Sequence, residues 1–257
     1  LALSKLTPLR KPGGGVRPIA APSLLRRLAG RLLSSTRKRE LATALGPRQF
    51  AVGTAAGTEV LAHTVRALPE ADPTLVLTAL DARNAYCTAS REACLAELGR
   101  AVPALLPCAE LFCCRTSRYL FWDGAGRCHT LRATGGVDQG DPLAPLLFAC
   151  GLAPCLEELE GRLRDAASAL GLARASVRVP AYLDDVVVLT PPALAAQVVP
   201  TAKAVVGAFE LEVNEGKAQV WSRASPQPLG VPSAHWRADG LTLVGVPLGE
   251  PLPASGL

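Results

Sequence analysis

The chain has 257 residues, of which 49% are hydrophobic and 19% charged, and this composition excludes a disordered protein and allows a large buried core. Only 4% of the residues are aromatic, so the core must consist mainly of Leu, Val and Ala. The most apolar stretch, residues 143–156, is too short to span a bilayer. Because no secretory signal is visible either, we expect an intracellular protein with no membrane partner.

Positive charge is concentrated near the start of the sequence. Residues 1–40 contain ten Lys and Arg but only one Glu, whereas the remainder carries a net negative charge. A basic block of this kind suits phosphate groups and favours a nucleic-acid partner. The alternative is a solvated basic helix face, since most charge runs are of that kind.

All eight cysteines lie between Cys87 and Cys155, and none forms a C-x-x-C pair. We expect free thiols in a reducing compartment. A zinc site is the alternative, and its ligands would be Cys108, Cys113, Cys128 and His129. The spacings of these residues fit no common zinc motif.

The first part of the chain predicts a hairpin followed by helices. Two extended runs flank a glycine turn within residues 9–19. Leucines at a helical period predict a helix over residues 23–45, and a second helix is predicted over residues 57–68, before a loop around Pro69.

The middle of the chain alternates between strands and helices. Residues 74–80 form an apolar run rich in β-formers that ends at Asp81. A helix is predicted over residues 91–102 with Ser90 as its cap. An Asp-Gly turn within residues 118–131 predicts a β-hairpin.

The last part predicts a long helix and a second strand pair. The helix covers residues 145–163, and strands are predicted over 177–182 and 186–189. A helix over 193–209 and a strand ending at Trp221 follow. This order of elements predicts an α+β fold in which an antiparallel sheet is covered by helices on one face.

Three aspartates are candidates for catalysis. Asp184 and Asp185 lie between two β-forming runs and should occupy a hairpin tip, where like charges this close raise each other's pKa unless a cation compensates. Asp81 ends another apolar strand, so a sheet that pairs this strand with the hairpin would bring three carboxylates together. Oxygen ligands of this kind suit Mg²⁺. A plain Asp-Asp turn is the alternative.

Six short segments, taken in order, carry a family resemblance. They are residues 11–19 (KPGGGVRPI), 81–86 (DARNAY), 139–148 (QGDPLAPLLF), 182–185 (YLDD), 211–217 (LEVNEGK) and 243–249 (LVGVPLG). Their sequences and order resemble the motifs of reverse transcriptases, and more narrowly those of the non-LTR (LINE-type) retrotransposon polymerases. The resemblance covers nearly the whole chain.

The resemblance implies a right-hand polymerase fold with palm and fingers, and a two-metal site in the palm. By it, Asp81, Asp184 and Asp185 would hold two Mg²⁺ ions, helped by the backbone carbonyl of Ala82, and Mn²⁺ could replace Mg²⁺. Lys217 would be the general acid that protonates the departing pyrophosphate. A solvated lysine at the start of a strand is the alternative for Lys217.

The resemblance also implies a nucleotide site. Lys11 and Arg17 would grip the triphosphate, although either could be an ordinary exposed residue of a turn. Tyr86 would be a steric gate against the 2′-hydroxyl, with a core tyrosine as the alternative. Gln139 would contact the nucleotide, and Gly140 would let the backbone approach it.

Other residues complete this interpretation or depart from it. Asp138 and Asp141, which flank Gln139, are predicted to be solvated or capping residues of a loop, and residues 243–249 would be the primer grip. Where the family usually has Asn and Ser, this chain has Cys87 and Ala144, which puts fidelity or efficiency in doubt more than chemistry.

Residues 1–257 are therefore predicted to be one reverse transcriptase domain, with the fingers mainly in 1–73 and parts of 100–135, and the palm mainly in 74–99 and 136–257. We expect the chain to be a piece of a longer polypeptide, because it has no Met and begins at Leu1, and we expect the thumb and an endonuclease to be missing. The expected partners are an RNA template, a DNA primer and deoxynucleoside triphosphates, in the nucleus if the element is LINE-type. A decayed or repurposed RNA-binding domain and an RNA-dependent RNA polymerase are the competing hypotheses.

Overall fold

A computed structural model describes residues 3–11 and 14–249. The chain divides into two compact units, one formed by Leu1–Leu45 and Asn84–Leu152, the other by Gly46–Arg83 and Ala153–Leu257. Helix α7 (Ala144–Ala169) contributes residues to both. The predicted division into fingers and palm stays a prediction, because the two compact units are defined by their internal contacts and not by a role in catalysis.

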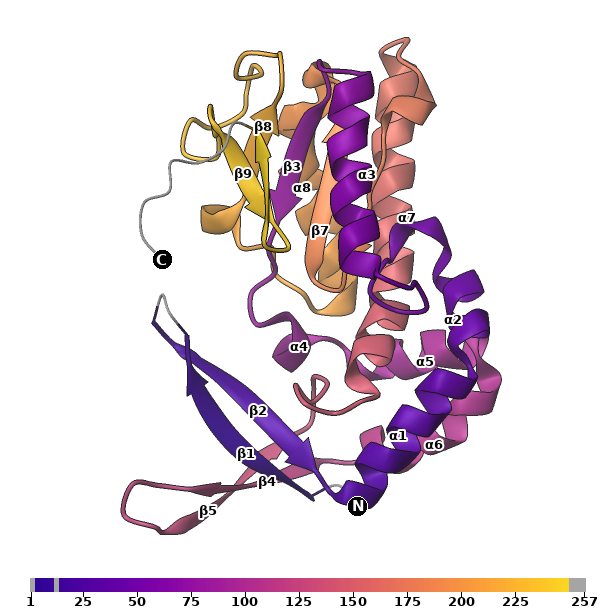
Figure 1. Cartoon of the computed structure of the whole chain (residues 1–257), viewed down its shortest axis with the longest axis vertical. Helices are drawn as coiled ribbons and strands as arrows, with labels where there is room; N and C mark the ends of the chain where they lie inside the picture. The colour runs from indigo at the N-terminus through magenta and orange to yellow at the C-terminus, as the bar shows by residue number, and fades with distance from the viewer. Residues whose placement is uncertain (1–2, 12–13, 250–257) are drawn as a thin grey trace. The chain divides into compact units, whose positions relative to one another are not determined.

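The first unit contains a four-stranded sheet with the order β2-β1-β4-β5 (Figure 1). Its strands are β1 (Leu3–Arg10), β2 (Val16–Pro22), β4 (Ser117–Trp122) and β5 (Cys128–Ala133). Strands β1 and β2 pair antiparallel, as do β4 and β5, which confirms both predicted hairpins. Strands β1 and β4 pair in parallel and join the two hairpins.

Helices complete the first unit. They are α1 (Leu24–Thr36), α2 (Lys38–Leu45), α4 (Ala85–Thr88), α5 (Arg91–Ala101) and α6 (Leu106–Cys113). Ser90 caps α5 as predicted, since its hydroxyl accepts a hydrogen bond from the Ala93 N–H at 3.4 Å. The single helix predicted over residues 23–45 is instead two helices that meet at Arg37.

Helix α1 buries the opposite face from the one that its leucines suggest. Leu24, Leu25, Leu28 and Leu32 are between 55% and 74% exposed. Arg26 and Gly30 are the buried residues. A side chain at Gly30 would touch Leu143 at 3.2 Å, so the close packing of this helix requires a small residue there.

The second unit contains an antiparallel sheet with the order β6-β7-β3-β8. Its strands are β3 (Val76–Leu80), β6 (Ala181–Tyr182), β7 (Asp185–Thr190) and β8 (Gln219–Ser222). Alternate residues of β3 face opposite sides of the sheet, and both sides are buried. Leu77 belongs to one hydrophobic cluster and Val76 to another.

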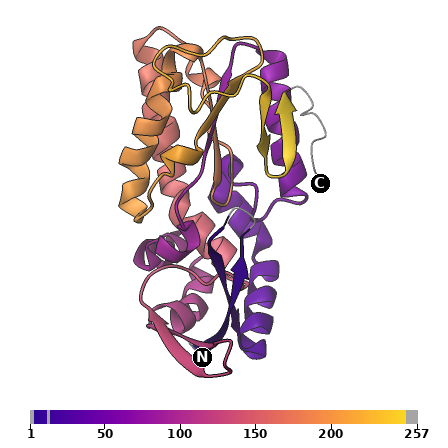
Figure 2. The same ribbon diagram turned by 90° about the vertical axis from the view of Figure 1, so that its left-hand side faces the viewer.

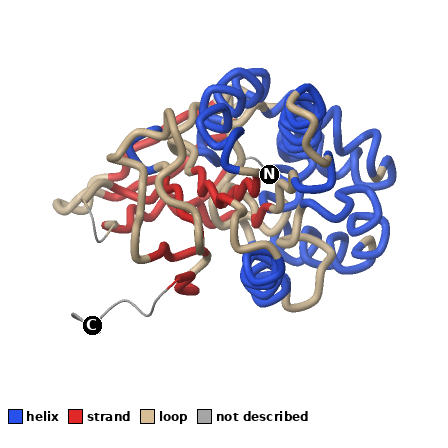
Figure 3. The backbone as a smooth tube through the Cα atoms, turned by 90° about the horizontal axis from the view of Figure 1, so that it is seen from above, coloured by secondary structure: helices blue, strands red, loops and turns tan. Residues whose placement is uncertain are grey.

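Helices lie on both faces of this sheet, rather than on one as predicted. Helix α3 (Gly57–Ala71) packs with the hairpin β9 (Gly240–Leu243) and β10 (Val246–Gly249) on the side of Leu77. Helix α8 (Ala195–Val206) packs on the side of Val76. Figure 2 shows α8 in orange and the β9–β10 hairpin in yellow, on opposite sides of the sheet. The α+β class is confirmed, and helices alternate with strands along the backbone (Figure 3).

Two details of the helices differ from the sequence prediction. Helix α3 continues through the buried Pro69 to Ala71, where a loop was predicted. The stretch 192–209 around α8 has the length and composition of a membrane-spanning helix. Ala195 of this helix lies in a hydrophobic cluster with Val76 and Val220 of the sheet, as in the core of a folded domain.

Candidate active site

Strand pairing brings the predicted carboxylates to one edge of the second unit's sheet. Strand β3 lies between β7 and β8, and Leu80, its last residue, is paired with Val186. Asp81 follows Leu80 and Asp185 precedes Val186, so extending the strand pairing by one residue places the two aspartates opposite each other. The condition on which the sequence hypothesis depends is therefore met by the strand order.

The turn that carries Asp184 is held by a residue that the sequence did not indicate. Leu183 has a positive φ of 56°, which is unfavourable for a branched side chain. Its N–H donates a hydrogen bond of 2.8 Å to Oε1 of the buried Gln49. The Phe50 N–H donates to the Ala181 carbonyl at 2.9 Å, so residues 49 and 50 hold strand β6 and the turn that follows it. No motif around Gln49 could have revealed this role.

Electrostatic repulsion acts on the clustered carboxylates. Asp185 is exposed at the start of β7. Partial burial, together with the Asp184 and Asp81 carboxylates, nevertheless raises the pKa of Asp185 to about 6. A cation at this edge would relieve the repulsion, which is the behaviour expected of metal-binding carboxylates.

The segment that contains Lys217 lies against Asp81. Val213 forms an antiparallel bridge with Ala82. The hydrogen bonds of this bridge run from Asn214 N–H to the Asp81 carbonyl (2.8 Å) and from Arg83 N–H to the Glu212 carbonyl (2.9 Å). The bridge thus leaves the Ala82 carbonyl unused, which is compatible with its predicted role as a metal ligand.

Two side chains of this segment reach the Asp81 carboxylate. Lys217 Nζ lies 3.3 Å from Asp81 Oδ2, and Asn214 Nδ2 donates a hydrogen bond of 3.1 Å to the same oxygen. The Lys217 side chain is 65% exposed, so this ion pair contributes little to stability and can exchange for another partner. Sequence reasoning assigned Lys217 to the reaction but did not foresee the amide of Asn214.

The oxygen donors fit hard divalent cations, although they do not form a closed metal site. Within residues 3–11 and 14–249, no group of three or more His, Cys, Asp or Glu side chains is arranged to hold a metal ion. The cysteines of the alternative zinc site therefore form no such group among the described residues. Its fourth expected ligand, His129, has Nε2 2.9 Å from Asp123 Oδ2. Lys217 already pairs with the negative charge of Asp81, so a metal cation would have to compete with Lys217 for that carboxylate.

The predicted nucleotide residues Gln139 and Gly140 lie in the first unit, on a loop beside β2. The Ala20 N–H donates a hydrogen bond of 2.7 Å to the Gln139 carbonyl. Gly140 has φ +116°, and a Cβ there would lie 2.6 Å from the Ala20 carbonyl oxygen. The glycine is thus required by close packing against β2. Its predicted approach to a nucleotide stays a prediction.

Asp138 and Asp141 are buried, so the prediction that they are solvated is wrong. Tyr119 donates a hydrogen bond of 2.6 Å to Asp138. Burial and this bond raise the pKa of Tyr119, which therefore remains a donor. Asp141 accepts a hydrogen bond of 2.8 Å from the Leu143 N–H, in the turn that precedes helix α7.

A buried arginine from α1 neutralises these two aspartates. The Arg26 guanidinium forms an ion pair with Asp141 and lies 3.9 Å from Asp138. It also lies over the ring of Phe112, 4.9 Å from the centroid. All three charged side chains are at most 4% exposed. Arg26 thereby ties the loop around Gln139 to α1.

A second buried arginine holds the start of the same loop. Arg91 donates hydrogen bonds to the carbonyls of Gly136 (2.9 Å) and Gly135 (3.0 Å). It also bonds the Arg115 carbonyl at 2.9 Å. Neither Arg26 nor Arg91 belongs to a recognised motif, and only their side-chain environments reveal them.

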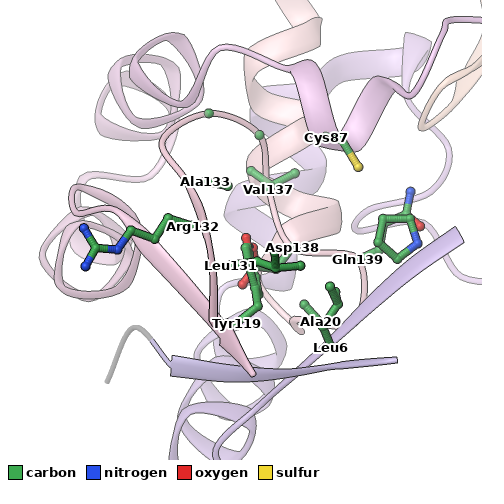
Figure 4. Close-up of a pocket in the computed structure, with 13 residues that line it drawn as sticks. Leu6, Ala20, Cys87, Tyr119, Leu131, Arg132, Ala133, Val137, Asp138 and Gln139 are labelled. Carbon is green, nitrogen blue, oxygen red and sulfur yellow. The ribbon is translucent and has the colours of Figure 1, made fainter. Parts of the chain in front are cut away.

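A cavity of about 320 Å³ opens beside this loop. Its lining includes Gln139, Cys87 and Tyr119, together with Leu6 and Leu131 of the sheet (Figure 4). Burial raises the pKa of the Cys87 thiol, so this residue is not an activated nucleophile.

The other predicted nucleotide residues also lie in the first unit. Lys11 is in the β1–β2 turn, where its N–H donates to the Gly15 carbonyl at 3.1 Å, and the neighbouring Pro12 and Gly13 of the motif lie outside the described residues. Arg17 is exposed on β2, opposite Leu9. Tyr86 is half-buried and stacks on Phe148, with ring centroids 4.8 Å apart and an interplanar angle of 7°.

The remaining motifs have regular structures. Residues 243–249 form the turn and second strand of the β9–β10 hairpin, so the predicted primer grip is a hairpin. Ala144, which replaces the usual Ser, is buried at the first position of α7. A hydroxyl there would need a partner in a buried environment.

Comparison with known proteins agrees with this description. Residues 9–247 match the family described as reverse transcriptase (RNA-dependent DNA polymerase). A curated relative, the retrotransposable element SLACS 132 kDa protein of Trypanosoma brucei gambiense, is 33% identical over 198 residues, which are 75% of this chain and 15% of the relative. The chain thus spans a small part of that relative's length.

Solved telomerase structures share the fold. The apo telomerase of Candida tropicalis, truncated from its C-terminal domain, superposes with a TM-score of 0.65 at 13% identity, covering 96% of this chain and 53% of that one. The Candida albicans telomerase, in complex with a fragment of telomeric RNA, gives 0.64 at 13% identity, covering 96% and 44%. At such low identity the likeness shows the fold alone.

Proposed function

The chain belongs to the reverse transcriptase family, and from this membership we propose that it is the polymerase core of a non-LTR retroelement, which copies an RNA template into DNA. The reaction is the attack of a primer 3′-hydroxyl on the α-phosphate of a deoxynucleoside triphosphate, with pyrophosphate leaving. The observation that carries the proposal is the pairing of β3 with β7, because it aligns Asp81 with the Asp184–Asp185 tip.

Asp81, Asp184, Asp185 and the Ala82 carbonyl would hold two divalent cations, Mg²⁺ or Mn²⁺. Two bound ions activate the attacking hydroxyl and stabilise the leaving oxygen of an in-line displacement. The oxygen-only donor set supports this assignment, as do the partial burial of Asp185 and the neighbouring Asp184 and Asp81 carboxylates, which together raise the pKa of Asp185 to about 6.

Lys217 would donate a proton to the departing pyrophosphate. Its ammonium group lies 3.3 Å from Asp81 Oδ2, so it belongs to the group of charges at the strand edge. Its side chain is 65% exposed, so a leaving group that arrives from solvent can reach the ammonium group. Proton transfer of this kind contributes about 10²- to 10⁴-fold to a rate.

In the first unit, Lys11 and Arg17 would bind the triphosphate. Arg17 is exposed on β2, and Lys11 lies in the turn that connects β2 to β1. Gln139 would contact the sugar end of the nucleotide, and the buried ion pair of Arg26 with Asp141 would keep its loop in place. Positioning and charge neutralisation are the main requirements of phosphoryl transfer.

Primer extension tests the proposal. We expect the full-length protein that contains this chain to extend a DNA primer on an RNA template with deoxynucleotides and Mg²⁺, and to lose this activity when EDTA removes the metal and regain it when Mg²⁺ is restored. RNA binding without extension under these conditions would instead favour the repurposed RNA-binding domain.

Replacing Tyr86 by alanine should weaken discrimination against ribonucleotides. The stack on Phe148 fixes the orientation of the Tyr86 ring, so a ring at this position can exclude a 2′-hydroxyl. We expect the ratio of kcat/KM for deoxynucleotides over ribonucleotides to fall at least tenfold, or about 1.4 kcal/mol. Tyr86→Phe keeps the ring and should keep the ratio. Unchanged sugar selectivity in Tyr86→Ala would remove the gate assignment.

A further inference from the structure

Leu183, the residue before Asp184, has a backbone conformation that its side chain opposes. Its φ of 56° lies in the left-handed region, where the Cβ atom of an ordinary residue is crowded by the backbone. Such a conformation persists only where the surrounding structure enforces it. Because Asp184 is the next residue, the conformation of Leu183 decides where the chain places the Asp184 carboxylate.

The side-chain carbonyl of Gln49 bonds directly to this strained residue. Gln49 Oε1 accepts a hydrogen bond of 2.8 Å from the Leu183 N–H and one of 3.2 Å from the Ala51 N–H. Only 2% of Gln49 is exposed, so bulk water does not compete for these bonds. The Leu183 N–H therefore has a fixed acceptor as long as the turn keeps its left-handed conformation.

The backbone on both sides of Gln49 is anchored. Before it, Arg48 Nε lies 2.6 Å from Glu160 Oε2 of helix α7, and the Glu160 side chain is 5% exposed. After it, the Phe50 N–H donates to the Ala181 carbonyl at 2.9 Å. A side chain on an anchored backbone can hold another group in place without rearranging itself.

The amide of Gln49 is not the group that stability alone would select at this position. Its Nε2 is buried and has no hydrogen-bond partner among the residues that the structure describes. A buried donor without a partner is unfavourable, and an apolar side chain of similar size would avoid that penalty. The oxygen of Gln49 therefore serves the turn at the expense of stability, as is common at functional sites.

From the bond to Leu183 and the anchored backbone we infer that Gln49 is the positioning residue for Asp184. By accepting the Leu183 N–H, Gln49 holds the left-handed turn, and the turn holds the Asp184 carboxylate at the tip of the β6–β7 hairpin. Gln49 acts only through Leu183 and takes part in no chemical step. The inference rests on the proposed function for its effect on the reaction, whereas its effect on the turn can be measured without catalysis.

The first test follows hydrogen exchange in the turn. The full-length protein is exchanged in EDTA without nucleotides, and mass spectrometry with fragmentation resolves the amides of residues 181–188. Met is close to Gln in size but has no acceptor, so we expect Gln49→Met to speed exchange of the Leu183 amide about tenfold. The Val188 amide, in the middle of β7, should exchange at an unchanged rate. Gln197→Met, at an exposed position of α8, should change neither rate.

The second test separates positioning from substrate binding. In primer extension we expect Gln49→Met to lower kcat about tenfold or more and to change KM for the nucleotide by less than about twofold, because misplacement of a group at the reacting centre affects kcat. The control is Val198→Ala, which removes buried methyl groups from α8 and lowers stability away from the turn. It should leave kcat and KM within about twofold of the wild type.

A double-mutant cycle identifies the residue through which Gln49 acts. Glycine adopts a positive φ without the strain that Leu experiences, so a glycine at position 183 keeps the turn without the bond to Gln49. In the Leu183→Gly background we therefore expect Gln49→Met to lower kcat by less than about threefold. An equal fall in the Leu and Gly backgrounds would show that Gln49 does not act through the turn, and would overturn the inference.

Two other outcomes would also overturn it. One is unchanged exchange of the Leu183 amide in Gln49→Met, and the other is a fall in kcat no larger than in Val198→Ala. Circular dichroism checks that each variant is folded, and Gln49→Asn, which withdraws the carbonyl by one methylene, replaces Gln49→Met if that variant does not fold. Because exchange is measured in EDTA, a protein that extends no primer would count against the proposed function, while exchange would still decide whether Gln49 holds the turn.

Discussion

Asp184→Ala should reduce the rate of primer extension at least a thousandfold. Asp184 lies at the hairpin tip beside Asp185 and contributes to the charge that raises the pKa of its neighbour. If it binds the catalytic cations, its loss removes a ligand that is needed when negative charge develops on the transferred phosphate. A thousandfold loss corresponds to about 4 kcal/mol of transition-state stabilisation. The measurement is single-nucleotide primer extension on an RNA template with Mg²⁺.

The control is Asp165→Ala on helix α7. Asp165 is 73% exposed, and within the described residues its ion-pair partner is the exposed Arg174, so its removal should change neither rate nor stability appreciably. Activity of Asp184→Ala within a factor of a few of the Asp165→Ala variant would end the assignment of the strand edge as the active site. Asp184→Ala should remain folded, because removing one of several crowded carboxylates relieves repulsion.

The positions of the catalytic carboxylates could be predicted because they depend on regular strands. Residues 186–189 and 74–80 are apolar and β-branched, and runs of this kind form buried neighbouring strands. The short connection at residues 183–184 allows only an antiparallel hairpin. Once β3 pairs with β7, the register places Asp81 beside Asp185.

The environment of the Gln139 loop could not be predicted, because it depends on partners that are distant in sequence. Asp138 and Asp141 are surrounded by glycine and proline, a composition typical of a solvated loop. Their partner Arg26 lies on α1, within a helical pattern whose leucines suggested the opposite buried face. Hydrophobic periodicity assumes that apolar residues point inward, and it fails where a buried ion pair selects the other face.

Arg26→Met should lower the free energy of unfolding by about 3–5 kcal/mol, the cost typical of breaking a buried ion pair from one side. The variant retains a long apolar side chain over Phe112 but leaves Asp141 and Asp138 buried without their cation. The measurement is urea-induced unfolding followed by circular dichroism. Arg27→Met is the matched control, since Arg27 is the next residue of α1 and is exposed, and it should change stability by less than about 0.5 kcal/mol.

The pair also predicts a rescue. Asp141→Asn removes the charge that Arg26→Met leaves uncompensated, so the double variant should be more stable than Arg26→Met alone, because an uncharged buried amide costs less than an isolated carboxylate. In primer extension, Arg26→Lys should raise KM for the nucleotide more than it lowers kcat, because Lys keeps the charge but not the planar fork that fixes the Gln139 loop. If Arg26→Met and Arg27→Met were equally stable, Arg26 would not hold this loop, and the order of residues 138–141 would have to come from the backbone bond between Ala20 and Gln139.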